Sequence, residues 1–599
     1  MNLPSKNLAE RRPRWSPWLA GALVASVTFA AFANSFSGPL IFDDFASISD
    51  NPSIRQLWPL QVPLSPPQGA GVAGRPVLNF SYALNYAFGR SDVASYHAVN
   101  LLIHLMAALA LFGLVRRTIA LRTARQDVCA DRGTTIFAAA AALLWAVHPI
   151  QTASVTYLSQ RAESLAGLFY LVTLYTFVRG AEADTPRARG AWFLGAVCAC
   201  FLGMATKETM ATAPLLVFLY DRTFLAGTFR GAWRKRGWVH LSLVSTWLLL
   251  LGLVATSRPN LRGIGFTDGI SSWTYAITEA QVVIRYLGLA VWPHPLVLDY
   301  NLSAVSDLMA AAPWLTLLAL LLASSVWALR RQPMLGFLGC SFFLLLSPSS
   351  SVIPVFGQVM AENRMYLPLA AVVVLLALAG RAALGHRMGL LVAGLIVSVF
   401  SGLTWQRNAE YRSALGLWER TAAQRPDNPR ARYQLANALV SSGRAAEAID
   451  QYQAALRLNP GFPEAWDGLG LALAKAGRLP EAIEAYGRAV TLRTDYPDAE
   501  YNLGNALAQS GRPWEAISHY RQALRLQPLF PEAEENLGSA LLETGDAAGA
   551  AAHYRAALAQ HPDDSDTHYD LALALRALGR TGEAAAEFST AARLGSRRP

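Results

Sequence analysis

The sequence predicts an all-α protein in which a polytopic membrane helix bundle is followed by an α-solenoid. The chain has 599 residues, and 53% of them are hydrophobic, which is more apolar than a soluble protein of this length. Apolar runs long enough to cross a bilayer recur over the first 405 residues. From Pro429 onward the composition becomes Ala-rich and charged, and the sequence repeats every 34 residues.

Eleven apolar runs predict about 11 membrane-spanning helices. They lie at residues 18–36, 98–115, 135–150, 162–178, 190–206, 210–226, 238–256, 312–330, 335–353, 365–382 and 387–405. The first run follows a basic segment with Lys6 and Arg11, and AFAN at 31–34 resembles a signal-peptidase site. Because its 19 residues suffice for one crossing, we interpret it as an uncleaved span. The alternative is a signal peptide that is removed.

Positively charged connections predict the orientation of these spans. Arg and Lys gather at residues 116–132, 222–236, 330–331 and 381–387, which we therefore expect to be cytoplasmic. The four connections agree only if a twelfth candidate, 277–297, is re-entrant or surface-lying and does not cross. The N-terminus is then cytoplasmic. The first large loop, 37–97, and everything after residue 405 are extracytoplasmic.

The C-terminal region, 429–599, holds five repeats that resemble the tetratricopeptide repeat (TPR). Its glycines recur at one spacing, at Gly443, Gly477, Gly511, Gly545 and Gly579. Leu, Ala and Tyr positions keep the same spacing, so the units begin near residues 429, 463, 497, 531 and 565. Small residues let paired helices approach, glycine permits the turn between them, and stacked units form a curved solenoid. We expect residues 411–428 to form a linker helix after a membrane domain of residues 1–410.

The concave face of a TPR solenoid is normally a peptide-binding surface. An amide side chain can both donate hydrogen bonds to an extended peptide backbone and accept them from it. The candidates to line this acceptor groove are Asn437, Asn502, Asn505 and Asn536. The alternative for each is an ordinary solvated position on a helix.

Charge and cysteine usage exclude several classes of function. The net charge of +10 is carried by short loops between apolar runs and forms no continuous basic stripe, so we do not expect nucleic-acid binding. The four cysteines lack the spacing of metal ligands, and no nucleotide-binding fingerprint is present. Asp43 and Asp44 could hold a divalent cation together with a phosphate, but no further ligands are evident from the sequence.

The polar residues most costly to place near a bilayer all fall on the predicted outer face. Asp43 and Asp44 follow the first span directly, and two adjacent like charges there indicate a functional role. Cations lie on the same face at Arg75, Lys207 and Arg364. This combination suits a reaction in which an acceptor hydroxyl loses its proton to an aspartate while cations hold a phosphate leaving group. A structural alternative remains for single residues: Lys207 could pair with Glu208, and His148 could cap a helix.

The whole chain resembles the transmembrane and TPR-containing (TMTC-like) protein O-mannosyltransferases, including their bacterial relatives, within the GT-C class of multispanning glycosyltransferases. The motifs that carry the resemblance are FDD at 42–44, RPVLNFSYALNY at 75–86, YHAVNLLIH at 96–104, HPIQT at 148–152, KE at 207–208, LDY at 298–300, ENRMYLP at 362–368 and the repeats. Each motif is weak alone, and their joint order is specific. The relatives have His and Glu after HP, where this chain has Gln151 and Ala153, and bacterial relatives more often have EHR where this chain has Asn363.

The resemblance implies a donor, an acceptor and a set of site residues. The donor would be a polyprenyl-phosphate sugar, with mannose as the expected sugar, and the acceptors Ser or Thr hydroxyls of extracytoplasmic proteins selected by the TPR domain. Asp43 or Asp44 would be the catalytic base, and Arg75, Lys207 and Arg364 would hold the donor phosphate. The supporting residues would be His97, His148, Glu208, Glu362 and Tyr366. In a bacterium the chain would lie in the inner membrane, with the catalytic loop and the TPR domain in the periplasm.

Three other functions remain open from the sequence. A membrane-anchored TPR scaffold without activity would make Asp43 and Asp44 dispensable. Transfer of a polyprenyl-linked sugar to a lipid or a glycan would keep the same chemistry with another acceptor. A transporter would place ionisable residues at mid-membrane depth, whereas here the polar groups gather at the ends of the apolar runs.

Overall fold

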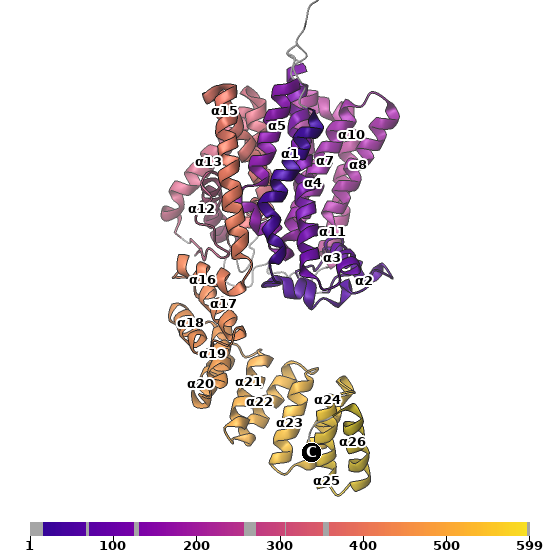
Figure 1. Cartoon of the computed structure of the whole chain (residues 1–599), viewed down its shortest axis with the longest axis vertical. Coiled ribbons are helices and arrows are strands. Elements are labelled where there is room, and N and C mark those ends of the chain that lie inside the picture. Colours follow the sequence, from indigo (N-terminus) through magenta and orange to yellow (C-terminus); the bar gives the residue numbers. More distant parts are fainter. Residues whose placement is uncertain are drawn as a thin grey trace, which may run out of the picture. The chain divides into compact units, whose positions relative to one another are not determined.

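The computed structural model describes residues 16–67, 71–124, 131–256, 271–302, 304–305, 307–350 and 359–595. The chain divides into two compact units, Met1–Leu417 and Trp418–Pro599 (Figure 1). All secondary-structure elements assigned within the described ranges are helices, which confirms the all-α fold class. The basic N-terminal residues, including Lys6 and Arg11, lie outside the described residues.

The first unit is a bundle of α-helices joined by short 3-10 and π segments. Its α-helices are α1 (Pro17–Phe32), α2 (Gln61–Leu64), α3 (Pro76–Gly89), α4 (Val93–Ala124), α5 (Asp131–Ala146), α6 (Thr152–Val155), α7 (Arg161–Glu182), α8 (Pro186–Met204), α9 (Ala213–Tyr220), α10 (Phe229–Ser245), α11 (Trp247–Thr256), α12 (Ser272–Val291), α13 (Leu308–Arg331), α14 (Pro333–Leu346) and α15 (Pro368–Glu410). Many begin with proline in the first turn, where no backbone N–H is needed. A single apolar core runs through α1, α4, α5, α7, α9, α14 and α15.

Six described helices are long and apolar enough to cross a membrane, so the chain is a multi-pass membrane protein. They are Pro17–Ser37, Val93–Arg122, Leu158–Glu182, Phe229–Thr256, Leu308–Arg331 and Pro368–Glu410. A seventh crossing results if Gly133–Ala146 and Pro149–Val155, which meet at 53°, form one broken span. The predicted 11 crossings are therefore not confirmed. Two of the predicted spans correspond to shorter helices, α9 with 8 residues and α14 with 14.

Two further predicted spans, 365–382 and 387–405, fall within the single helix α15. Gly385 breaks this helix, because its φ of 74° and ψ of 177° lie outside the helical region. A Cβ added to Gly389 would lie 3.4 Å from the Cα of Arg381, so the chain turns back on itself at Gly385. Only glycine adopts such a backbone conformation without strain. The α15 hairpin therefore consists of two antiparallel arms, and Gly385 is its tip.

The second unit is a solenoid of paired helices. The pairs are α17 (Pro429–Ser441) with α18 (Ala445–Leu458), α19 (Pro463–Lys475) with α20 (Leu479–Leu492), α21 (Pro497–Gln509) with α22 (Pro513–Leu526), α23 (Pro531–Glu543) with α24 (Ala547–Gln560), and α25 (Ser565–Ala577) with α26 (Thr581–Leu594). α16 (Ala414–Gln424) precedes them. The glycine at each intra-pair turn has φ between 73° and 93°, as the sequence period requires. The ring of Tyr520 packs directly over Gly504, so the small residues of the period set the distance between helices.

Candidate active site

The acid pair lies in the loop that follows η1 (Ala33–Ser37), immediately before the π segment η2 (Phe45–Ser49). The two carboxylates have different environments. Asp44 is fully buried, and its carboxylate accepts hydrogen bonds from the backbone N–H of Ile41 at 3.0 Å and of Ser159 at 2.6 Å. Burial raises the pKa of Asp44 to about 7. Asp44 therefore fixes the loop against the start of α7, and both its oxygens are already engaged.

Asp43 is exposed. Its backbone N–H donates to the hydroxyl of Tyr157 at 3.2 Å, and the same hydroxyl hydrogen-bonds its carboxylate. Surrounding protein desolvates this carboxylate and raises its pKa above the ordinary value of 3.8. Of the two aspartates, Asp43 has the accessible carboxylate that a hydroxyl could approach.

A short stretch between α6 and α7 connects the acid pair to the predicted cations. We call residues 157–163, which comprise η5 (Leu158–Gln160) and its flanks, the hub segment. Tyr157 holds Asp43 and Ser159 holds Asp44, as described above. Glu163 forms an ion pair with Lys207, with 2.6 Å between Oε1 and Nζ, and both side chains are about nine-tenths buried. The hub segment therefore contacts both residues of the acid pair and, through Glu163, also Lys207.

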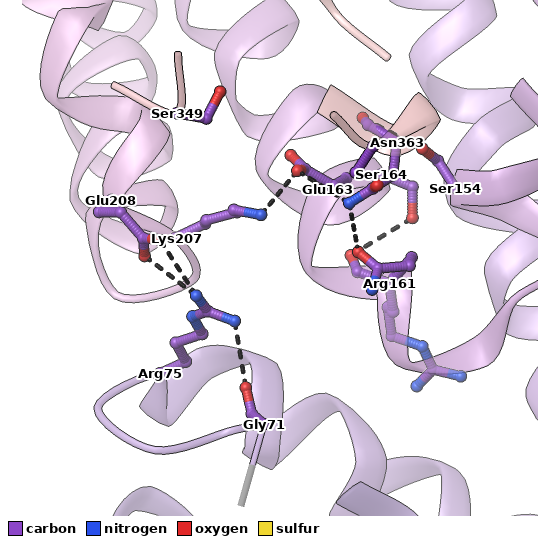
Figure 2. A network of polar contacts seen from close by, with 12 residues as sticks. Gly71, Arg75, Ser154, Arg161, Glu163, Ser164, Lys207, Glu208, Ser349 and Asn363 are labelled. Atoms are coloured by element: carbon purple, nitrogen blue, oxygen red, sulfur yellow. Dashed lines mark hydrogen bonds and ion pairs between the residues drawn. The ribbon is translucent and has the colours of Figure 1, made fainter. Parts of the chain in front are cut away.

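Lys207 and Glu208 do not pair with each other; each has a partner on another element. Figure 2 shows the two side chains directed to different partners. Lys207 has extended backbone angles (φ −160°, ψ 145°), so adjacent side chains leave the chain on opposite sides. The Glu208 carboxylate accepts from Arg75 at 3.0 and 3.3 Å, and Arg75 also donates to the carbonyl of Gly71. Two ion pairs thus lie side by side at the start of η6 (Glu208–Thr212).

Arg161 of the hub segment is structural. Its guanidinium is completely buried and donates to Asn100 at 2.6 Å, to Asn85 at 2.9 Å and to the carbonyl of Tyr96 at 3.1 Å. These bonds join the hub to α3 and α4. The YHAVN and SYALNY motifs of the sequence therefore supply the acceptors that satisfy one buried arginine.

The ENRMYLP motif forms η9 (Glu362–Met365) and the start of α15, against the other side of the hub segment. The Asn363 amide donates to Gln160 at 2.6 Å and to Glu163 at 3.4 Å, so the asparagine found in place of histidine contacts the site. Arg364 is buried, donates to the carbonyl of Val359 at 2.8 Å, and lies 3.6 Å from Glu279 of α12. Of the three predicted phosphate ligands, Arg364 is the most deeply enclosed.

The other predicted supporting residues join helices near the site. His97 contacts the carbonyl of Gly38 at 3.1 Å, and His148 caps η4 (Pro149–Gln151) and contacts the carbonyl of Ala290. The Tyr366 hydroxyl hydrogen-bonds His104 at 2.9 Å. Glu362 is buried, accepts from Tyr300 at 3.0 Å, and lies 3.5 Å from Arg407; burial raises its pKa. These four positions shape the site without facing the acid pair directly.

Two adjoining cavities lie in the bundle, and the smaller one reaches Glu163 of the hub segment. The smaller, of about 20 Å³, has polar lining from Glu163, Ser349 and Arg364. The larger, of about 100 Å³, is lined almost entirely by apolar side chains of α4, α5, α7, α9, α14 and α15. Tyr170, Leu345 and Leu367 line both cavities, so the apolar space continues into the polar one. A ligand with a long apolar tail and an anionic head matches this sequence of linings.

Within the described residues no cluster of three or more His, Cys, Asp or Glu side chains has the geometry of a metal site. Sequence reasoning missed Tyr157, Ser159 and Glu279 as parts of the site. Tyr157 and Ser159 stand in the TYLSQRAE stretch, whose polar residues beside an apolar run were the available signal. Glu279 was visible as an acid within an apolar helix, but its pairing with Arg364 joins residues far apart in the chain.

In the TPR unit the predicted asparagines are half-buried, and each is hydrogen-bonded to another side chain. Asn505 accepts from the Tyr520 hydroxyl at 2.7 Å and from Asn536 at 2.8 Å. Asn502 donates to Asp467 at 3.0 Å, one repeat earlier, and Asn437 accepts from Tyr452. Two of these bonds, Asn502–Asp467 and Asn536–Asn505, join successive repeats, and all of them hold the amide groups in defined orientations.

Comparison with known proteins places these features in a family. A family model for the tetratricopeptide repeat matches residues 406–461, 433–500, 501–565 and 536–599. A protein O-mannosyl-transferase of Caenorhabditis elegans is 24% identical over 470 residues, covering 74% of this chain and 63% of the relative. The human protein O-mannosyl-transferases TMTC1 and TMTC4 are each 26% identical, covering 74% and 73% of this chain and 56% and 66% of their own lengths. The homologues of this chain are protein O-mannosyl-transferases of the TMTC family.

The TMTC resemblance predicted from the sequence is thus confirmed. The matched region spans between about half and two thirds of the length of these TMTC relatives. Among solved structures, the crystal structure of MamA protein aligns with a TM-score of 0.27 at 23% identity, covering 28% of this chain and 91% of MamA. The TMTC match extends through most of the chain.

Proposed function

We propose that this protein is a membrane glycosyltransferase that moves a sugar, mannose in the family's case, from a polyprenyl-phosphate donor to a Ser or Thr hydroxyl of an extracytoplasmic protein. The observation that carries the proposal is the hub segment, which joins an accessible base at Asp43 to a buried cation at Lys207. The TMTC homologues support the same class of reaction. The inner membrane, the cytoplasmic N-terminus and the extracytoplasmic TPR domain are part of this proposal.

The reaction follows from the charges at the site. An acceptor hydroxyl beside Asp43 gives its proton to the carboxylate while its oxygen forms a bond to the anomeric carbon of the sugar. The bond from that carbon to the phosphate oxygen breaks at the same time, and polyprenyl phosphate leaves with the electron pair. Asp43 returns the proton to solvent or to the departing phosphate. All atoms and charges balance without an oxidant, a nucleotide or a further reactant.

The cations would act mainly on the leaving group. A polyprenyl-phosphate sugar carries one negative charge as a diester, and the charge on the phosphate grows as the sugar departs. Lys207 and Arg75 are each neutralised by a glutamate in the resting site, at 2.6 and 3.0 Å. As the negative charge on the phosphate increases, its attraction to both cations becomes stronger. Interactions that become stronger in the transition state are the ones that accelerate a reaction. Arg364 would contribute from within the smaller cavity.

The adjoining cavities support a lipid-linked donor. The polar lining at Glu163 and Arg364 is where the phosphate would lie, and the apolar cavity would hold the start of the isoprenoid chain. A soluble nucleotide sugar would leave the apolar cavity without an occupant. The half-buried asparagines of the TPR unit would hold the acceptor polypeptide, which favours protein over lipid or glycan acceptors.

The test compares extracytoplasmic glycoproteins in cells that express the native chain, Asp43→Asn, or the control Asp50→Asn. Asp50 is an exposed acid of the same loop, and its carboxylate accepts a hydrogen bond from the neighbouring Ser49. Loss of glycans in Asp43→Asn alone, with normal membrane insertion, supports the proposal. Unchanged glycoproteins in all three strains would favour the scaffold alternative, and altered lipid or glycan products would favour the other acceptor class. Reporter fusions after residue 410 test the proposed orientation.

A further inference from the structure

A second, separate groove runs along the α15 hairpin. It has a volume of about 470 Å³ and is lined by α5, the end of α12 and both arms of α15. Many lining side chains, including Trp292 at 72% and Leu395 at 66%, are exposed. In a membrane-spanning bundle such exposed apolar side chains face the hydrocarbon region, so the groove opens to lipid.

The charged end of the groove lies at the hairpin tip. Among the described residues that line it, Arg381 and His386 are the only ionisable ones, and no carboxylate is among them. The Arg381 guanidinium stacks over the ring of Phe137, with 5.7 Å to its centroid, which directs the cation into the groove. His386 approaches α5, because a Cβ on Gly133 would lie 3.8 Å from its Cε1. The groove therefore has one cationic end and an otherwise apolar wall.

This cationic end is remote from the acid pair. The start of α15 lies near the site, because Tyr366 just before it hydrogen-bonds His104. The tip at Gly385 lies 17 residues beyond Pro368, which is about 26 Å along a helix. Figure 1 shows α15 reaching the end of the bundle opposite to α2 and α3. A lipid with its phosphate at Arg381 consequently cannot present that phosphate to Asp43. The groove is not the donor site proposed above.

The length and the shape of the groove fit a lipid chain. From His386 to Phe400 the second arm rises about 21 Å, which exceeds the roughly 15 Å hydrocarbon depth of one leaflet. Gly380 and Gly389 on the facing arms contribute no side chain, so the floor of the groove is backbone, and a Cβ at Gly380 would meet nothing within 4 Å. Basic pockets at helix ends on the cytoplasmic side are suited to anionic lipid headgroups.

We propose that this groove binds a phospholipid with an anionic headgroup, with its phosphate at Arg381 and His386 and one acyl chain along the facing arms of α15. The lipid lies along the surface that the two arms form together with α5. The proposal does not depend on the sugar-transfer reaction, since neither the groove nor its cationic end contacts the acid pair.

The experiment measures lipid retained by the purified full-length chain after exchange into mixed micelles of phosphatidylglycerol and phosphatidylcholine, quantified by mass spectrometry. The native chain retains phosphatidylglycerol preferentially, and Arg381→Gln lowers that preference about fivefold, the effect of one basic residue at a lipid surface. Arg331→Gln, a matched change at the exposed end of α13 outside the groove, leaves the preference intact. Gly380→Leu adds a side chain to the groove at a position where a Cβ meets nothing within 4 Å, and it lowers retention of both lipids.

Three results would overturn the proposal. Equal losses in Arg381→Gln and Arg331→Gln would mean that only general surface charge attracts the lipid. Unchanged retention in Gly380→Leu would mean that lipid binds elsewhere. The native chain could also be dimeric in micelles. If Gly380→Leu then becomes monomeric and loses no lipid, the groove is covered by a second copy of the chain.

Discussion

Changing each aspartate of the acid pair to asparagine should affect a different property of the protein: stability for Asp44 and activity for Asp43. Asp44 accepts two backbone N–H groups from inside the protein, at 2.6 and 3.0 Å. Asparagine has one acceptor oxygen, so one of these N–H groups would face an NH₂ group instead. Loss of a buried hydrogen bond to a carboxylate costs about 1.5–3 kcal/mol. Asp44→Asn should therefore lower the thermal unfolding midpoint of the purified chain by several degrees.

Asp43→Asn should leave stability nearly unchanged and remove activity. Its carboxylate is exposed, and surface substitutions usually change stability by less than about 0.5 kcal/mol. Removal of a general base lowers the rate by about 10²- to 10⁴-fold. The assay measures the unfolding midpoint and sugar transfer for both variants in the same detergent.

We therefore expect Asp43→Asn to lose activity and keep stability, and Asp44→Asn to lose stability and keep some activity. A folded, inactive Asp43→Asn and a destabilised Asp44→Asn with residual transfer would agree with it. A stable but inactive Asp44→Asn beside an active Asp43→Asn would show that the roles are reversed.

The stability of the native chain should also fall as pH rises from about 4 to 7, because burial raises the Asp44 pKa to about 7 and the folded state therefore favours the protonated form in that window. Asp44→Asn should flatten that slope.

Three further predictions concern other parts of the molecule. Lys207→Gln should destabilise the chain by about 3 kcal/mol, because it leaves Glu163 buried without its cation; adding Glu163→Gln should restore stability in thermal unfolding but not transfer. The rate of transfer should rise with pH through a pKa above 3.8, because Asp43 must be ionised to act as base and its pKa is raised; a pH profile that is flat down to 3.8 would contradict this. Gly504→Ala should destabilise the TPR unit by about 1–3 kcal/mol, since its Cβ would lie 2.6 Å from the Tyr520 ring, whereas Gly487→Ala, with open space, should stabilise it slightly in the same melt.

The repeat period was readable from the sequence because each unit repeats the same local contacts. Gly443 and its equivalents need a positive φ, and the tyrosine of the period packs on a glycine of the paired helix, as Tyr520 does on Gly504, so spacing alone predicted the helix pairs. Apolar composition likewise identified a membrane bundle. It did not give the number of crossings, because helix length in the bundle depends on where the chain turns, as in α9 and α14, which are shorter than the predicted spans.

The candidate site was predicted as a set of residues, but not as a network. Composition and position indicated that Asp43, Lys207 and Arg364 matter, yet neither their partners nor the division of roles between Asp43 and Asp44 could be inferred. Those depend on the hub segment, which contacts the acid pair from more than 100 positions away in the chain. An ion pair such as Lys207–Glu163 needs the fold to bring two helices together, and adjacent charges such as Lys207 and Glu208 suggest a pairing that extended backbone prevents.

The most direct test of the account is sugar transfer by the purified full-length chain in liposomes, with polyprenyl-phosphate mannose as donor and a Ser/Thr-containing polypeptide as acceptor. The account predicts glycosylated acceptor and free polyprenyl phosphate in equal amounts from the native chain, with at least a hundredfold less from Asp43→Asn. Transfer that continues at the native rate in Asp43→Asn would contradict the central claim that this carboxylate is the base.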